Sequence, residues 1–308
     1  MEHDLEQRLR LRSMDPDFYA LERQLLWPRQ WLVAGRADEL AGPGHYAMWE
    51  ETGVPLIVIR SVDGELRCFY NSCRHRGAPV VREPRGRNRA LRCQYHSWTY
   101  DTFGRLVSVP DERDFVDLRF EERSLVPVAA KVVAGWVLVN QSAPDAAAPD
   151  LPAQGGKQTL TTLRFEAQAN WKTMLAALDA SSGPDGAAAP VALGWNGLLV
   201  AQDASQLAVT VWPVAEWPGS ADTCSIRVAV LAPEWDEDDG SPLESADWAN
   251  QHQAITAWVA ASAAIAEGWQ RELTAGQLPS ALQGVARHRQ VDEAIGPHAV
   301  PTAWRVGA

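Results

Sequence analysis

The sequence has few cysteines, no long apolar run and no basic start. Its 308 residues contain four cysteines, which is too few for the disulfide framework of a small secreted domain. No run of about 18 apolar residues is present, so we expect no membrane span. Residues 1–4 are polar and acidic, unlike the beginning of a signal peptide. These absences predict a cytoplasmic protein.

The net charge of −11 argues against nucleic acid and anionic membranes as partners. The chain between Arg67 and Arg105 nevertheless holds nine arginines, opposed by Glu83 and Asp101. Such a basic segment is a candidate docking face for an acidic reductase or ferredoxin. The candidate docking residues are Arg74, Arg76, Arg85, Arg87 and Arg89. A set of solvated loop arginines is the alternative.

The pattern of elements predicts an α+β protein of more than one domain. A helix broken by Pro28 is expected over residues 15–31, followed by short strands and Gly/Pro turns as far as residue 140. Further strands and an Ala-rich helix over residues 246–273 follow. We therefore expect an N-terminal helical segment (1–40) that packs on the C-terminal domain. An all-β domain (41–145), a linker (146–157) and an α+β domain (158–308) follow it.

Two Cys-and-His pairs suggest a metal centre. Cys73 and His75 lie in one expected loop, and Cys93 and His96 lie in the next. A Rieske [2Fe–2S] cluster takes two thiolates on one iron and two imidazoles on the other, so two such loops supply its ligands. A Cys₂His₂ zinc finger instead places both cysteines in one loop and both histidines on a helix. The spacing favours the Rieske cluster.

These loops resemble those of Rieske non-haem iron oxygenases of the aromatic-ring-hydroxylating type. The motif reads Cys-x-His-Arg-Gly, then Cys-x-Tyr-His-x-Trp-x-Tyr-Asp, and the similarity extends to Asn170-Trp171-Lys172. Respiratory Rieske proteins carry two extra cysteines where this chain has Ala78 and Tyr95. The resemblance implies an all-β Rieske domain and a helix-grip-like α+β domain of the oxygenase catalytic type. It also implies that subunits form head-to-tail rings, usually trimers.

The same family holds a mononuclear iron on two histidines and a carboxylate, and these ligands are missing here. Counting from Asn170-Trp171-Lys172, the histidine positions fall at Gly183 and Ala188. Counting back from Gln270, the carboxylate position falls at Ser262. No histidine lies between Trp98 and Gln251. We therefore expect no mononuclear iron on this chain, unless three later histidines rebuild the site. These are His252, His288 and His298.

A chain with a cluster but no iron can still serve a neighbour. We expect a hetero-oligomer in which this chain takes electrons from a ferredoxin or flavin reductase. It would pass them to the mononuclear iron of a catalytically complete α subunit. Asp179 is a candidate for the family's electron-relay carboxylate, or an ordinary acidic residue at a helix end. Two alternatives stay open: a complete mono- or dioxygenase with displaced ligands, and a Rieske redox sensor or structural pseudoenzyme.

Overall fold

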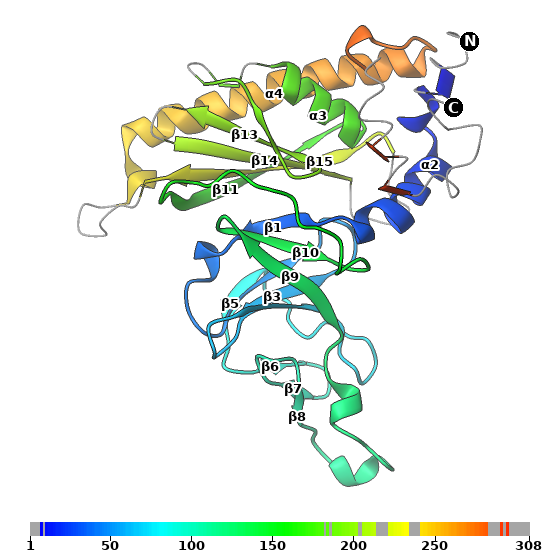
Figure 1. Cartoon of the computed structure of the whole chain (residues 1–308), viewed down its shortest axis with the longest axis vertical. Coiled ribbons are helices and arrows are strands. Elements are labelled where there is room, and N and C mark those ends of the chain that lie inside the picture. Colours follow the sequence, from blue (N-terminus) through cyan, green and yellow to red (C-terminus); the bar gives the residue numbers. More distant parts are fainter. Residues whose placement is uncertain are drawn as a thin grey trace. The chain divides into compact units, whose positions relative to one another are not determined.

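The computed structural model describes residues 7–8, 10–181, 183–184, 187–202, 205–213, 221–233, 241–282, 290–291 and 294–295. The chain divides into two compact units (Figure 1). One unit is Trp31–Asp150, and the other joins Met1–Gln30 to Leu151–Ala308. Within the described ranges, no helix is both long enough and apolar enough to cross a membrane.

The unit of residues 31–150 is built on a seven-stranded antiparallel sheet with the strand order β1-β10-β9-β4-β3-β2-β5. A smaller antiparallel sheet has the order β6-β7-β8. One hydrophobic core joins the two sheets and includes Cys73 and Cys93. The strands are β1 (Leu32–Arg36), β2 (His45–Trp49), β3 (Leu56–Arg60), β4 (Leu66–Tyr70), β5 (Arg85–Arg87), β6 (Leu91–Arg92), β7 (Thr99–Tyr100), β8 (Leu106–Ser108), β9 (Pro127–Val133) and β10 (Trp136–Asn140).

The other unit is a five-stranded antiparallel sheet with helices α3 and α4 along one face (Figure 1). The strand order is β11-β15-β14-β13-β12. Alternate apolar residues of β14 and β15, such as Val209 and Val228, are fully buried. The elements are α2 (Pro16–Leu21), β11 (Gln158–Ala167), α3 (Trp171–Ala180), β12 (Val191–Leu193), β13 (Gly197–Gln202), β14 (Ser205–Pro213), β15 (Cys224–Ala232) and α4 (Ala246–Thr274).

A buried ion pair connects the N-terminal helix to α3. Lys172 Nζ lies 2.7 Å from Glu22 Oε1, and both side chains are almost completely buried. Trp171 Nε1 donates a hydrogen bond to the other carboxylate oxygen of Glu22 (3.1 Å). Asn170 caps α3 through its side chain and bonds through its backbone N–H to Gln270 on α4. These contacts explain why the N-terminal residues belong to this unit.

The predicted N-terminal segment 1–40 is wrong at its C-terminal end. Residues 31–40 belong to the all-β unit because β1 pairs with β10 and buries Leu32 and Val33. The broken helix predicted over residues 15–31 is α2, a π-helical turn (Glu22–Leu26) and a 3-10 turn (Trp27–Arg29). The unit boundary after residue 150 falls inside the predicted linker 146–157.

Candidate metal centre

The two Cys-and-His loops share one backbone frame. The Cys73 N–H donates to Ala78 O (2.8 Å), and the Gly77 N–H donates to Cys73 O (2.8 Å). In the second loop the Cys93 N–H donates to Trp98 O (2.9 Å), and the Ser97 N–H donates to Cys93 O (2.9 Å). Gly77 and Ser97 hold the same position of this frame, with φ of 77° and 60°. Each loop therefore presents one cysteine at its base and one histidine toward its tip.

The four predicted ligands differ in their exposure. Cys73 and Cys93 are buried, His75 is partly buried, and His96 is exposed. The two imidazole rings lie edge to face with their centroids 4.6 Å apart. His75 also stacks on Trp98, with the ring centroids 4.9 Å apart and an interplanar angle of 11°. The cysteines thus belong to the core, and the histidines lie at its boundary with solvent.

Tyr100 contacts the base of the first loop. Its phenol oxygen lies 3.3 Å from Cys73 Sγ and accepts a hydrogen bond from the Arg74 N–H (2.9 Å). Because the amide occupies a lone pair of that oxygen, the phenol hydrogen is free to point at the sulfur. Tyr100 belongs to the sequence motif, but the motif alone predicts no role for it. Its spacing of four residues after His96 is the signal that could have identified it.

These residues fit the chemistry of an iron–sulfur cluster. His75 Nδ1 is buried and has no hydrogen-bond partner, as expected of a nitrogen reserved for a metal. Burial, together with nearby His96, Arg76 and Arg123, lowers the pKa of His75 and favours the neutral imidazole that binds metals. Burial raises the pKa of the Cys73 thiol, so a bound iron would replace its proton.

A site for a single metal ion would need at least three suitable side chains close together. Within the part of the chain that the structure describes, no three His, Cys, Asp or Glu side chains are grouped to hold one metal ion. The predicted cluster spreads its four ligands over two irons, so it does not need such a group. His252 is exposed and stacks on Trp248, with the ring centroids 5.6 Å apart. His288 and His298 lie outside the described residues.

The three positions expected for mononuclear-iron ligands lie in unlike surroundings. Gly183 has a φ of 78°, and a Cβ there would approach Ala187 Cβ to 2.8 Å and Val200 Cγ1 to 2.9 Å. Ala188 is exposed. Ser262 is fully buried, with its hydroxyl 3.2 Å from Ser181 Oγ. Asp179 is exposed in the last turn of α3.

The structure separates the candidate docking arginines into paired and unpaired groups. Arg85 pairs with Glu39. Within the described ranges, no ion pair involves Arg74, Arg76, Arg87 or Arg89, and all four are exposed. Arg87 and Arg89 line a surface hollow of about 500 Å³, completed by Pro43, Gly44, Val62 and Asn88.

Sequence comparisons identify the domain that carries these loops. A profile described as "Rieske [2Fe-2S] domain" matches residues 30–128. The chain is 34% identical over 145 residues to the chlorobenzene dioxygenase α subunit of Cupriavidus sp. strain PS12, covering 46% of this chain and 31% of that protein. It is 28% identical over 172 residues to the glycine betaine monooxygenase oxygenase subunit of Pseudomonas aeruginosa, covering 52% and 40%. The matches thus span less than half the length of these relatives.

Solved structures extend the likeness to both units. The fold is similar to that of the quaternary ammonium Rieske monooxygenase CntA in complex with L-carnitine, with a TM-score of 0.70. That match is 17% identical and covers 94% of each chain. Naphthalene 1,2-dioxygenase from Rhodococcus sp. gives a TM-score of 0.61 at 16% identity, covering 89% of this chain and 83% of that one. The predicted fold, an all-β domain with an α+β domain of the oxygenase type, is confirmed.

Proposed function

We propose that this chain, a Rieske [2Fe–2S] domain on the fold of the Rieske oxygenases, is an electron-delivering subunit without its own catalytic iron. Cys73, His75, Cys93 and His96 would hold the cluster, which supplies one-electron transfer when bound. A ferredoxin or flavin reductase would provide the electron. The mononuclear iron of a catalytically complete α subunit, in a hetero-oligomer, would receive it.

The residues at positions 183, 188 and 262 support the proposal that this chain holds no mononuclear iron. None of these residue types offers a useful iron ligand, whereas the family's site needs two imidazoles and a carboxylate. The Gly183 position has no room for a larger side chain on its present backbone, because even a methyl group would contact Val200 at 2.9 Å. Ser262 Oγ lies beside the Ser181 hydroxyl, which also accepts a hydrogen bond from Trp258 Nε1 (2.7 Å). All three positions thus carry small residues, and the buried hydroxyl of Ser262 already has a hydrogen-bond partner.

The exposure of His96, one of the proposed cluster ligands, supports delivery of the electron to another protein. His96 is exposed, and the neighbouring Tyr95 is 68% exposed. An exposed imidazole ligand gives a partner access to the cluster without unfolding either loop. Asp179, also exposed, stays a candidate relay carboxylate on the α+β unit.

A complementation experiment tests the proposal. A complete oxygenase α subunit from the same genome would carry a Cys→Ser change in its own Rieske loop, so that it keeps its mononuclear iron but loses its cluster. We expect added wild-type chain to restore product formation with reductase present, and the His96→Ala variant to restore none. Full turnover with His96→Ala, or no turnover with a wild-type chain that forms a stable complex, would contradict electron delivery.

The unpaired arginines would receive the electron donor. Arg87 and Arg89 line a surface hollow of about 500 Å³, and Cys93 is the fourth residue after Arg89. The backbone positions of Arg89 and Cys93 therefore lie within about 14 Å of each other, the reach of four extended residues. A donor docked at this hollow would therefore lie close to the loop that carries Cys93.

Charge reversal tests this docking site. We expect Arg87→Glu/Arg89→Glu to slow cluster reduction by a plant-type acidic ferredoxin at least tenfold at low salt, because electrostatic steering is lost. Stopped-flow absorbance measures the rate, and reduction by dithionite checks that the cluster is intact. Arg113→Glu/Arg119→Glu makes the same charge change at two exposed, acid-paired arginines and is the control. Equal slowing in both variants would refute a specific site.

A further inference from the structure

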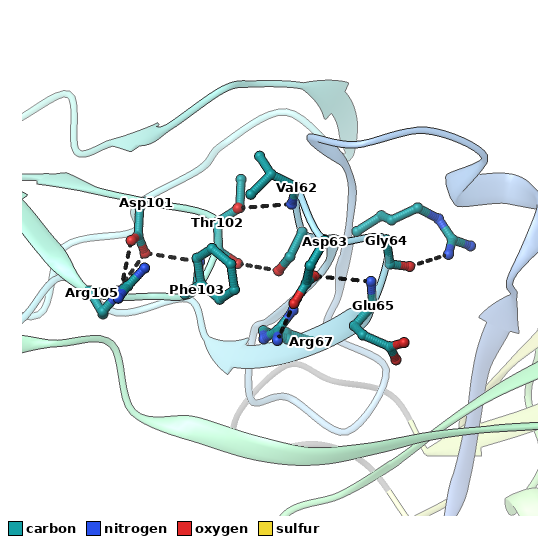
Figure 2. Close-up of polar contacts among 11 residues, drawn as sticks. Val62, Asp63, Gly64, Glu65, Arg67, Asp101, Thr102, Phe103 and Arg105 are labelled. Atoms are coloured by element: carbon teal, nitrogen blue, oxygen red, sulfur yellow. Dashed lines mark hydrogen bonds and ion pairs between the residues drawn. The ribbon is translucent and has the colours of Figure 1, made fainter.

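Two neighbouring turns of the all-β unit have the same construction (Figure 2). The turn between β3 and β4 closes with the Ser61 N–H on Glu65 O (2.8 Å) and the Gly64 N–H on Ser61 O (2.9 Å). The turn between β7 and β8 closes with the Asp101 N–H on Arg105 O (2.9 Å) and the Gly104 N–H on Asp101 O (3.0 Å). The two turns thus share one hydrogen-bond frame.

Each turn also contains an aspartate that fixes an arginine. Asp63 accepts a hydrogen bond from the Glu65 N–H (3.1 Å) and forms a two-point ion pair with Arg67, both N···O distances being 2.8 Å. Asp101 accepts from the Phe103 N–H (2.9 Å), and its other oxygen pairs with Arg105 Nε at 2.9 Å. The aspartate–arginine spacing is four residues in both turns, so each guanidinium is held over its own turn.

Phe103 and Thr102 join the two turns. The Arg67 and Arg105 guanidinium carbons lie 4.6 Å and 4.7 Å from the centroid of the Phe103 ring. Such cation–ring contacts are favourable because the ring face carries partial negative charge. Thr102 O accepts a hydrogen bond from buried Ser61 Oγ (2.6 Å), and Thr102 Oγ1 accepts one from the Val62 N–H (3.3 Å). Figure 2 shows these contacts crossing from one turn to the other.

The joined turns are continuous with the predicted cluster site. Asp101 directly follows Tyr100, whose phenol oxygen lies 3.3 Å from Cys73 Sγ. Gly104 packs so closely on Phe69 that an added Cβ would lie 2.4 Å from Phe69 Cε1, and Phe69 belongs to the core that contains both cysteines. A shift of the β7–β8 turn would therefore move Tyr100 relative to Cys73.

We infer that residues 61–67 and 101–105 form a clamp that positions Tyr100 against Cys73 and so sets the reduction potential of the cluster. Phe103 and Asp101 are positioning residues in this clamp. The inference rests on the proposed ligation of the cluster by Cys73. A reduced cluster carries one more negative charge, so a phenol hydrogen bond to its sulfur ligand favours the reduced form and raises the potential.

A double-mutant cycle on the loaded protein tests the clamp. The midpoint potential would be measured by a redox titration followed by visible absorbance and EPR, for Phe103→Leu, Tyr100→Phe and the double variant. We expect both single changes to shift the potential in the negative direction. The double variant should shift no further than Tyr100→Phe alone, because Phe103 acts through Tyr100. Phe103→Tyr keeps an aromatic ring between the two guanidiniums, so its reduction potential should equal that of the wild-type protein.

Phe120→Leu is the matched control, because Phe120 packs partly buried against the same core. It should leave the potential unchanged while lowering the melting temperature. Additive shifts in the double variant, or a shift with Phe120→Leu equal to that with Phe103→Leu, would overturn the clamp. Iron and sulfide contents of the wild-type protein test the proposed function separately. A wild-type chain that binds no cluster would contradict the proposed function, whereas a loaded chain with additive shifts would contradict only the clamp.

Discussion

Gly77 and Ser97 show how single residues shape the two cluster loops. Both have positive φ, at the position whose N–H closes the loop onto the cysteine carbonyl. A glycine takes this backbone without steric cost, and its place in the first loop is predictable from the sequence. A serine rarely adopts it, so the matching turn in the second loop could not be predicted. The Arg92 guanidinium, which donates to Ser97 Oγ at 2.8 Å, helps to hold it.

The candidate ligand residues can be identified from the sequence because the chemistry of the cluster limits the choice of residue. Thiolate and imidazole are needed in a fixed number, and the sequence offers two Cys-and-His pairs of regular spacing. The supporting contacts are different in kind. The contact of Tyr100 with Cys73 depends on tertiary packing, as do the contacts of Trp98 and Phe115 with His75. Spacing alone does not specify such contacts.

Gly104 should be among the least replaceable residues of the all-β unit. Gly104→Ala places a methyl group 2.4 Å from Phe69 Cε1 at a φ of 80°. We expect it to lower the free energy of unfolding by about 2–4 kcal/mol, through backbone strain and overpacking together. Urea unfolding followed by circular dichroism measures the loss.

Gly64→Ala is the control for that prediction. Its φ is 89°, but an added Cβ would meet nothing within 4 Å. Backbone strain alone should therefore cost about 1–2 kcal/mol. If the two substitutions proved equally destabilising, close packing against Phe69 would not explain the glycine at position 104.

Among the elements, the predicted Ala-rich helix of the α+β unit agrees closely with the structure. Helix α4 (Ala246–Thr274) nearly coincides with the predicted 246–273, because its Ala-rich composition favours a helix and Ser245 caps its beginning. Strand β1 (Leu32–Arg36) was missed, since it is short, contains Gly35 and changes register between Val33 and Gly35. Only its pairing with β10 makes it a strand.

The buried Glu22–Lys172 pair should be essential to the attachment of the N-terminal helix. Lys172→Met leaves the Glu22 carboxylate buried, with the hydrogen bond from Trp171 Nε1 in place of its ion pair. We expect a loss of about 3–5 kcal/mol in the free energy of unfolding, because a buried charge loses its counter-ion. Denaturant unfolding of the full chain measures it.

A second variant separates loss of the counter-ion from loss of packing. Glu22→Gln/Lys172→Met removes both charges while an amide oxygen still faces Trp171 Nε1. It should recover most of the stability lost in Lys172→Met, because no uncompensated charge is then buried. A double variant as unstable as the sum of the two single variants would argue that shape, and not charge, governs this contact.

At the scale of the whole molecule, a net charge of −11 contrasts with the arginine-rich segment of the all-β unit. Within the described part of this segment, Arg74, Arg76, Arg87 and Arg89 are exposed and take part in no ion pair. The sequence indicated that segment, but only the structure separates paired Arg85 from the unpaired arginines at positions 87 and 89. The position of the unit boundary after residue 30 likewise depended on strand pairing and could not be placed from composition.

Changes at the positions expected for mononuclear-iron ligands should not affect the cluster. Ala188 is exposed and lies in the α+β unit, outside residues 31–150 that carry the cluster loops. Ala188→Ser should therefore leave the visible spectrum and the turnover of the reconstituted complex unchanged. Loss of turnover in a complex that still assembles would show that this position takes part in catalysis.

The metal content of the anaerobically purified chain tests the central claim most directly. A Rieske cluster alone requires two irons and two acid-labile sulfides per chain. We predict that stoichiometry, together with the visible and EPR spectrum of a Rieske cluster and its loss in the His96→Ala variant. Three irons with two sulfides per chain would contradict the proposal, because the third iron would mark a mononuclear site that this chain holds itself.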